Sequence, residues 1–133
     1  MIDRKLNFLL IEDDVRTLEL LKRDLNELEI ANNIFTAVNG NEAITLYREK
    51  SKDHTIDIIF SDVVMPICNG IEFLERFRKE IDPTNKQNII MLTSKSDRSI
   101  VLKTINFGVT IYLLKPWNQQ TLIQKIMTVL EEE

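Results

Sequence analysis

The chain has 133 residues, of which 44% are hydrophobic and 29% are charged, and its net charge at pH 7 is −4. These values fit one globular domain with a core of its own, and the negative charge argues against the basic footprint of a nucleic-acid-binding domain. The chain has one cysteine, no segment near the about 20 apolar residues of a membrane helix, and no signal-peptide pattern at its amino terminus, so we expect a cytoplasmic protein without an intrachain disulfide.

Five short apolar runs predict β-strands at 6–11, 33–38, 56–60, 88–93 and 108–114. The first, third and fourth runs are nearly continuous, which favours central strands that are buried on both faces of a parallel sheet. In the last run, polar and apolar residues alternate more, with Tyr112 between apolar neighbours, which is typical of a strand at the edge of a sheet.

Between these runs, apolar residues recur at three- and four-residue steps and predict helices over 15–29, 39–50, 70–81, 97–107 and 118–130. Asp13 and Asp14 are both candidate caps of the first helix, and Asn41 is the candidate cap of the second. We expect Gly108 to end the fourth helix and Asn118 to begin the fifth. The predicted inner faces of the third and fourth helices consist of Ile71, Leu74, Phe77 and Ile81, and of Ile100, Val101, Ile105 and Phe107.

Strands that alternate with helices predict the α/β class, here one doubly wound domain with right-handed crossovers and a five-stranded parallel sheet covered on both faces. In such a sheet, functional groups gather beyond the carboxyl ends of the strands. Glu12, Asp13 and Asp14 follow the first predicted strand, and Asp62 follows the third. Thr93 and Ser94 stand at the end of the fourth strand, and Lys115 follows the fifth. We therefore expect these residues along one rim of the sheet.

The chemistry of this rim suits phosphoryl transfer. Crowded carboxylates repel one another, and a hard divalent cation such as Mg²⁺ with oxygen ligands is the simplest remedy. A lysine ammonium and a threonine hydroxyl would neutralise phosphoryl oxygens. The carboxylate of Asp62 would supply the attacking oxygen.

Four segments of the sequence carry a resemblance to a known family. They are "LLIEDD" at 9–14, "SDVVMPICNG" at 61–70, "MLTSKSD" at 91–97 and "YLLKPW" at 112–117. In this order, and each at a predicted strand end, they resemble the response regulator receiver domains of two-component signalling. The resemblance covers about residues 6–130. It implies one flavodoxin-like receiver domain across residues 1–133, with strand order 2-1-3-4-5 and no output domain within this chain.

The resemblance implies a role for each matching residue on the phosphoryl side of the site. Asp62 would accept the phosphoryl group, and Lys115 would pair with that group. Thr93 resembles the switch hydroxyl that moves toward the phosphoryl group, and Tyr112 resembles the aromatic residue whose rotamer follows this movement. The Lys115–Pro116 peptide bond is expected to be cis.

On the metal side, Glu12 and Asp13 resemble the acidic pair that organises Mg²⁺ in this family. The direct ligands would be Asp13, Asp62 and the backbone carbonyl of Val64. We expect Asp14 to be a surface or capping residue rather than a ligand.

The function that the resemblance implies is a phosphorylation-controlled switch rather than a turnover enzyme. A histidine kinase or a phosphotransfer protein would donate to Asp62, and the face of the fourth helix, fifth strand and fifth helix would then change its contacts with an effector or a fused output domain. Candidate contact residues are Lys103, Asn106, Tyr112 and Gln119. We expect no direct binding of nucleic acid or membrane. The sequence leaves open whether the domain acts alone or belongs to a longer regulator, and whether phosphorylation makes it dimerise.

Four further positions carry narrower expectations. Val64 and Lys95 stand two residues beyond Asp62 and Thr93, at sites that influence hydrolysis in the family, and the apolar Val64 predicts slow self-dephosphorylation. Cys68 is expected to be a small apolar plug in a turn where Pro66 limits the backbone and Gly70 supplies conformational freedom before the next helix. Trp117 either packs under the last loop or is exposed at a partner surface.

Two other classes of protein share parts of this pattern. A haloacid-dehalogenase-like phosphatase also uses aspartate, lysine, a hydroxyl and magnesium, but it would need a D-x-D motif after the first strand, where this chain has "EDDVRT". A flavodoxin-like FMN carrier would need a hydroxyl-rich phosphate loop at the same place, whereas the acidic "IEDDVRT" repels phosphate in the absence of a metal. Turnover of a small phosphoester would favour the first class, and a coloured protein the second.

Overall fold

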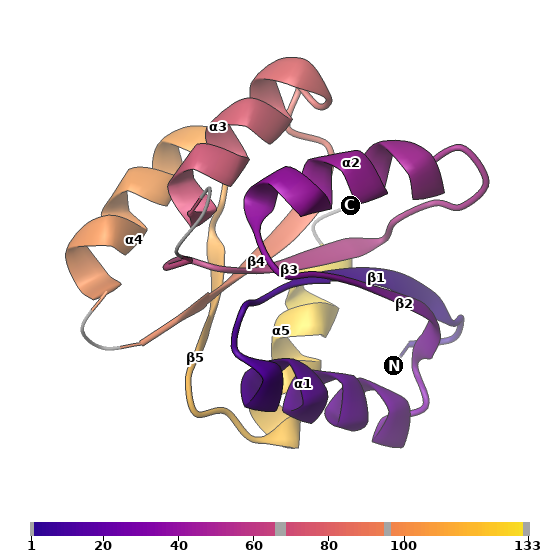
Figure 1. Ribbon diagram of the computed structural model, residues 1–133. Coiled ribbons are helices and arrows are strands. Elements are labelled where there is room, and N and C mark those ends of the chain that lie inside the picture. Colours follow the sequence, from indigo (N-terminus) through magenta and orange to yellow (C-terminus); the bar gives the residue numbers. More distant parts are fainter. Residues whose placement is uncertain (1, 66–68, 95–96, 132–133) are drawn as a thin grey trace.

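The computed structural model describes residues 2–65, 69–94 and 97–131 and contains one parallel sheet (Figure 1). Its strands are β1 (Leu6–Ile11), β2 (Ala31–Ala37), β3 (Ile58–Asp62), β4 (Asn88–Thr93) and β5 (Ile111–Leu114). They lie in the order β2-β1-β3-β4-β5, with every neighbouring pair parallel. The predicted fold class and strand order are therefore confirmed, and β5 is an edge strand, as the alternation around Tyr112 indicates.

Helices cover both faces of the sheet. Those described are α1 (Val15–Glu27), α2 (Gly40–Lys50), α3 (Gly70–Glu80), α4 (Arg98–Thr104) and α5 (Gln119–Glu131), with the 3₁₀ helix η2 (Ile105–Phe107) after α4. In Figure 1, α1 and α5 lie on one side of the sheet, and α2, α3 and α4 lie on the other. Within the part of the chain that the structure describes, no helix is both long and apolar enough to cross a membrane.

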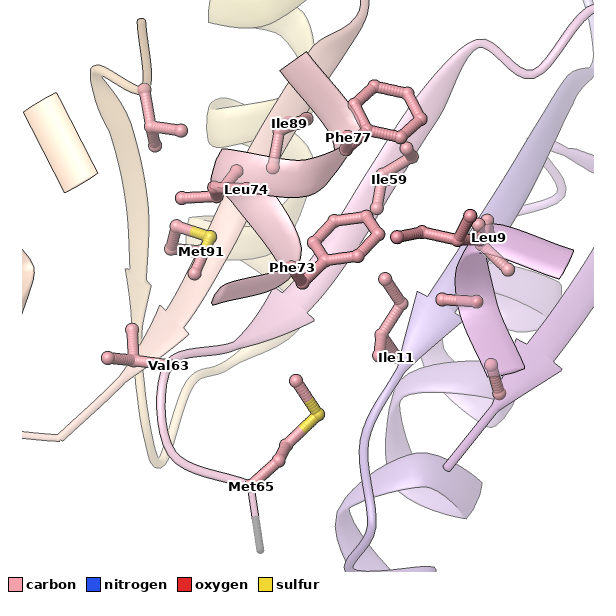
Figure 2. Close-up of a cluster of buried hydrophobic side chains, with 14 of the residues drawn as sticks. Leu9, Ile11, Ile59, Val63, Met65, Phe73, Leu74, Phe77, Ile89 and Met91 are labelled. Carbon is pink, nitrogen blue, oxygen red and sulfur yellow. The ribbon is translucent and has the colours of Figure 1, made fainter. Parts of the chain in front are cut away.

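Each face of the sheet has its own apolar core, and the central strands contribute side chains to both cores. In β3, Ile58 and Phe60 join the cluster under α1 and α5, whereas Ile59 joins the cluster under α2 and α3. Figure 2 shows this second cluster, in which Phe73, Leu74 and Phe77 of α3 lie over the sheet. Because successive strand residues point to opposite faces, both of which are buried, the central strands read as continuous apolar runs.

The first two helices begin at residues whose side chains accept backbone hydrogen bonds. Asp14, one of the two predicted candidates, caps α1 by accepting from the backbone N–H of Thr17 at 3.1 Å. The prediction for α2 was wrong: Asn39, not Asn41, is the cap, and it accepts from the N–H of Glu42 at 2.9 Å. Asn41 lies inside the first turn, where its side chain accepts from Arg76 of α3. The cap lies two residues earlier than predicted because Asn39 has the extended backbone that a cap requires.

The predicted helix over 97–107 consists of two pieces. It is α-helical only to Thr104 and continues as η2, and Gly108 ends it with a left-handed φ of +78°. The tighter winding of a 3₁₀ helix changes which side chains face the sheet, and Ile105 is 52% exposed rather than on the inner face. Phe107 packs against the core as predicted, whereas the side chain of Val101 lies outside what the structure describes.

Gly70, the first residue of α3, is required for a different reason from the predicted one. It does not have a positive φ, so freedom of the backbone is not what selects glycine here. A Cβ at this position would lie 2.5 Å from the carbonyl oxygen of Asp62 and 2.8 Å from Cα of Val63. The start of α3 therefore packs directly against the chain that follows β3. Pro66 and Cys68, the other predicted residues of this turn, lie outside the described residues.

Candidate functional site

The strand register brings the polar strand ends together. Ile11 of β1 pairs with Ser61 of β3, so the next residues of the two strands, Glu12 and Asp62, lie side by side at the carboxyl edge. In the half of the sheet that contains β4 and β5, Thr93 of β4 pairs with Leu114 of β5. The backbone N–H of Lys115 then donates to the carbonyl oxygen of Thr93 at 2.7 Å, which fixes the start of the turn after β5.

Three carboxyl groups meet at this edge. Ligand oxygens of Glu12, Asp13 and Asp62 all lie within 4.8 Å of one another. Glu12 is buried, Asp62 retains 8% of its side-chain surface, and Asp13 is exposed. The cluster therefore has a closed inner side and an open outer side, through which a solute can approach.

Lys115 enters the cluster from the end of β5. Its Nζ lies 3.3 Å from Oε1 of Glu12 and 3.3 Å from Oδ1 of Asp62. Burial alone would lower the pKa of this ammonium, but attraction to Asp62 and Glu12 outweighs burial and raises the pKa. Lys115 therefore stays charged and bridges two carboxyl groups.

One ammonium does not neutralise the cluster. Burial, followed by repulsion from Asp62, raises the pKa of Glu12 from 4.5 to about 8. Burial is the larger cause, and the second cause is repulsion between two carboxyl groups that the single ammonium does not fully offset. Three oxygen donors that share this excess negative charge fit a hard divalent cation, so the cluster is a candidate metal site.

Val64 lies beside the cluster in the segment after β3. Its backbone N–H donates to Oδ1 of Asp62 at 3.3 Å, and its residue surface is 50% exposed. The apolar side chain is thus open to solvent next to the carboxylate of Asp62. Coordination of a metal by the Val64 carbonyl stays a prediction, and Lys95, the other position linked to hydrolysis, lies outside the described residues.

Thr93 is the last residue of β4 and lies at the same edge, largely buried. Its hydroxyl donates to the carbonyl oxygen of Ser94 at 3.2 Å. The side chain is therefore held by its own backbone rather than by the carboxylate cluster, and its movement toward a phosphoryl group stays a prediction.

Tyr112 points from β5 toward the helical layer of α4. Its hydroxyl lies 2.7 Å from Oγ1 of Thr104, the last residue of α4, and donates to the carbonyl oxygen of Val109 at 3.0 Å. Thr104 is fully buried. The tyrosine was predicted from the sequence but this threonine was not, because a single polar residue near a helix end has no distinguishing pattern.

Trp117 and Asp24 form a second contact that was not predicted from the sequence. The side chain of Trp117 is half-buried against the cluster under α1 and α5, and its indole N–H donates to Oδ2 of the buried Asp24 at 2.9 Å. Of the two open alternatives, packing against the fold is therefore the one observed. The signal in the sequence was an aspartate between Leu21 and Leu25, on the apolar face of the first predicted helix.

The residue types, their order and their convergence at one edge agree with a comparison against known families. The family model for the response regulator receiver domain matches residues 8–127. The chain belongs to this family. The resemblance carried by the four segments is thus confirmed, and the chain is a receiver domain of the two-component response regulators.

Curated relatives of this receiver domain are regulators of transcription. The probable transcriptional regulator ycf29 of Porphyra purpurea is 34% identical over 126 residues, which cover 93% of this chain and 56% of the relative. The transcriptional regulatory protein CpxR of Escherichia coli (strain K12) is 33% identical over 125 residues, covering 94% of this chain and 50% of CpxR. The chain thus spans about half the length of these curated relatives.

Solved receiver structures share the fold along almost the whole chain. A putative response regulator from Chloroflexus aurantiacus has a TM-score of 0.82 and 25% identity, with 96% of this chain and 99% of that chain covered. CheY in a CheX–CheY–BeF₃–Mg²⁺ complex from Borrelia burgdorferi has a TM-score of 0.81 and 26% identity, with 96% of this chain and 90% of that chain covered.

Proposed function

We propose that this receiver domain is a phosphorylation-dependent switch in which Asp62 accepts a phosphoryl group from a phosphohistidine. The observation that carries the proposal is the position of the Lys115 ammonium, 3.3 Å from the carboxyl groups of both Glu12 and Asp62 at the carboxyl edge of the sheet. An acceptor carboxylate, a fixed cation and a cluster of oxygen donors are the groups that phosphoryl transfer requires.

Asp62 is the best acceptor among the three carboxyl groups. Glu12 is buried, and its pKa of about 8 keeps it protonated near neutral pH, so it is a poor nucleophile. Asp13 is exposed and has no ion pair with Lys115 among the described contacts. Asp62 combines contact with the ammonium, a backbone hydrogen bond from Val64 and a position at the end of a rigid central strand.

In the proposed step, an oxygen of the Asp62 carboxylate attacks the phosphorus of the phosphohistidine. A phosphorus–oxygen bond forms, the phosphorus–nitrogen bond breaks, and the imidazole nitrogen leaves with the electron pair and takes up a proton. The product is an acyl phosphate on Asp62, whose two negative charges lie within reach of Lys115. Attack by water on the acyl phosphate later releases inorganic phosphate and restores the carboxylate.

Glu12, Asp13 and Asp62 would hold a divalent cation, which we propose is Mg²⁺, with the carbonyl of Val64 as a further ligand. When bound, this cation supplies positive charge that offsets the carboxylates and the oxygens of the transferring group. The carboxyl groups fit this role because their own electrostatics leave an excess of negative charge. CheY, the solved receiver from Borrelia burgdorferi, forms a complex that contains BeF₃ and Mg²⁺.

The switch itself would follow from movement of Thr93 toward the acyl phosphate, with Tyr112 and α4 responding. Phosphorylation would shift a pre-existing balance between two arrangements of the α4–β5–α5 face. Among the side chains that the structure describes on this face, Leu102, Ile105 and Leu114 are exposed and apolar. Such side chains suit contact with a protein partner, and Lys103 and Asn106 lie exposed among them.

The partners follow from this chemistry. A histidine kinase or phosphotransfer protein would supply the phosphoryl group, and an effector protein or a fused output domain would read the switch. CpxR, of which the match covers 50%, is a transcriptional regulatory protein. Binding of DNA would then belong to that output region and not to this acidic domain. A histidine kinase uses cytoplasmic ATP, so the proposal also places this domain in the cytoplasm.

The test uses a small phosphodonor, which removes the need to know the kinase. Wild-type protein is incubated with acetyl phosphate and Mg²⁺, and its intact mass is measured. We expect a gain of one phosphoryl group, about 80 Da. Asp62→Asn and addition of EDTA should each abolish the gain, because they remove the acceptor and the cation. An unchanged wild-type mass would refute the proposal, whereas steady turnover of small phosphoesters would favour a phosphatase.

A further inference from the structure

Helix α1 buries a carboxylate that the proposed function does not use. Asp24 is 3% exposed and lies between Leu21 and Leu25, which are both fully buried. An aspartate on the apolar face of a helix is costly unless its oxygens have hydrogen-bond donors. Its partners therefore indicate why it is there.

The partners come from the other end of the chain. Oδ2 of Asp24 accepts from the indole N–H of Trp117 at 2.9 Å, and Oδ1 accepts from the side-chain amide of Gln119 at 3.0 Å. Arg23 donates to Oδ1 as well, at 3.2 Å, and the amide of Gln119 also reaches Glu27, one turn further along α1. The two oxygens of Asp24 are thus engaged by the turn after β5, through Trp117, and by the first residue of α5, Gln119.

This turn is the segment that presents Lys115 to the carboxylate cluster. Its backbone is fixed at one end by the bond from the N–H of Lys115 to Thr93, at 2.7 Å. At the other end, Asn118 caps α5 by accepting from the N–H of Thr121 at 2.8 Å. Asp24 is bonded to Trp117, which lies between these two ends, and to Gln119, which directly follows the second end.

We propose that Asp24 is a positioning residue that ties the 115–119 turn to α1 and thereby holds the Lys115 ammonium between Glu12 and Asp62. The helix that carries Asp24 starts directly after the acidic segment that contains Glu12 and Asp13. One rigid helix therefore sets the relative positions of the acidic segment and the lysine turn. This inference rests on the proposed function for its kinetic readout, but the contact itself can be observed independently.

A carboxylate suits this role better than an amide does. Each of its two oxygens accepts from a different donor of the turn, whereas asparagine has one acceptor oxygen and an NH₂ group that would face a donor. In Asp24→Asn, the indole N–H of Trp117 therefore either loses its acceptor or bonds to a neutral amide oxygen, which is a weaker acceptor than a carboxylate. The shape of the side chain is kept, so the substitution tests the hydrogen bonds rather than the packing.

The first measurement reports the contact. Trp117 is the one tryptophan of the chain, so a ¹H–¹⁵N spectrum of the full chain contains one indole N–H resonance. A hydrogen bond to a carboxylate moves that resonance downfield and slows its exchange with solvent. We expect Asp24→Asn to move it upfield and speed its exchange. An indole resonance that is identical in the two proteins would overturn the inference.

The second measurement is the rate of phosphorylation by acetyl phosphate at saturating Mg²⁺. We expect Asp24→Asn to slow the maximal rate roughly tenfold, since small displacements of a catalytic group have effects of this size. Trp117→Phe, which keeps the ring but removes the N–H, should slow it in the same way. The double variant should be no slower than the slower single variant, because both substitutions release the same turn.

Asp57→Asn is the matched control. Asp57 is also a largely buried carboxylate, which accepts from Arg4 at 2.8 Å and from the N–H of Asn7 at 2.7 Å, but it lies just before β3, at the opposite edge of the sheet. Asp57→Asn should lower the free energy of unfolding and leave the phosphorylation rate of the folded protein unchanged. An Asp24→Asn rate equal to wild type, or an equal slowing in Asp57→Asn, would overturn the inference. A wild-type chain that takes up no phosphoryl group would refute the proposed function instead, and the indole resonance would still decide whether Asp24 holds the turn.

Discussion

The Nζ atom of Lys115 lies 3.3 Å from Oδ1 of Asp62, although the two residues are 53 positions apart in the sequence. The parallel sheet makes this contact, because it aligns the carboxyl ends of β3 and β5 at one edge. The same ammonium also pairs with Glu12. It therefore compensates part of the negative charge of three clustered carboxyl groups. The charge that remains depends on pH, because the pKa of Glu12 is raised to about 8.

We predict that the metal-free protein becomes less stable as the pH rises from about 4.5 to about 8. The pKa of Glu12 is raised from 4.5 to about 8 in the folded state, so over this range the folded chain keeps a proton that the unfolded chain has lost. The contribution is fully present below pH 4.5 and is lost as the pH passes through 8. Urea unfolding in EDTA at several pH values measures it, with a slope of at most about 1.4 kcal/mol per pH unit for one proton.

Glu12→Gln isolates this contribution, because glutamine stays neutral at every pH. The difference in unfolding free energy between wild type and Glu12→Gln should therefore decline with pH across the same range. Parallel curves for the two proteins would show that Glu12 titrates normally and that the cluster is not crowded.

Gly70→Ala should lower the free energy of unfolding by about 1–3 kcal/mol, the usual cost of overpacking. Its new Cβ would lie 2.5 Å from the carbonyl oxygen of Asp62, so either α3 or the backbone of Asp62 must shift. Urea unfolding provides the measurement. Glu75→Ala, at an exposed position of the same helix, is the control and should change stability by less than about 0.5 kcal/mol. Equal stability of Gly70→Ala and wild type would mean that the close approach is absent in solution.

The hydroxyls of Thr104 and Tyr112 should be energetically coupled. Thr104→Val keeps the shape of the buried side chain and removes its 2.7 Å hydrogen bond to the tyrosine, at a cost of about 1 kcal/mol. In a double-mutant cycle with Tyr112→Phe, we expect a coupling energy of at least about 0.5 kcal/mol. Strictly additive effects would indicate that the two hydroxyls do not contact each other in the unphosphorylated protein.

Loss of the phosphoryl group from Asp62 should be slow in wild type and severalfold faster in Val64→Asn. Val64 is half exposed beside the Asp62 carboxylate and has no polar atom in its side chain to orient a water molecule. The amide of asparagine supplies such a group. The decay of the phosphorylated mass after removal of acetyl phosphate measures the rate. Val38→Asn, a similarly exposed valine after β2, is the control. A wild-type half-life of seconds that Val64→Asn leaves unchanged would contradict this prediction.

The sheet and the convergence of the site could be predicted because they depend on short-range patterns and one topological rule. Apolar runs mark strands that are buried on both faces, and polar residues at their ends must then meet at one edge. Glu12, Asp62 and Lys115 meet there as expected. Even so, β3 ends at Asp62, two residues beyond the apolar run from which it was predicted, because the polar Ser61 still belongs to the ladder.

What the sequence could not supply depends on tertiary contacts. Asn39 and Asn41 are equivalent as cap residues until the backbone conformation is known. The change to 3₁₀ winding that exposes Ile105 is not encoded in the spacing of apolar residues. The attachment of Trp117 to Asp24 joins residues 93 positions apart, and no local pattern predicts such a pair.

The proposed function depends on Asp62 being the residue that receives the phosphoryl group. Borohydride reduces an aspartyl phosphate to homoserine, so treatment of the phosphorylated protein followed by tandem mass spectrometry of its peptides locates the modified residue. We predict homoserine at position 62 in wild type, formed with acetyl phosphate and Mg²⁺ and absent when EDTA is added. Homoserine at position 13, or reduction at no carboxyl group of the cluster, would contradict the account.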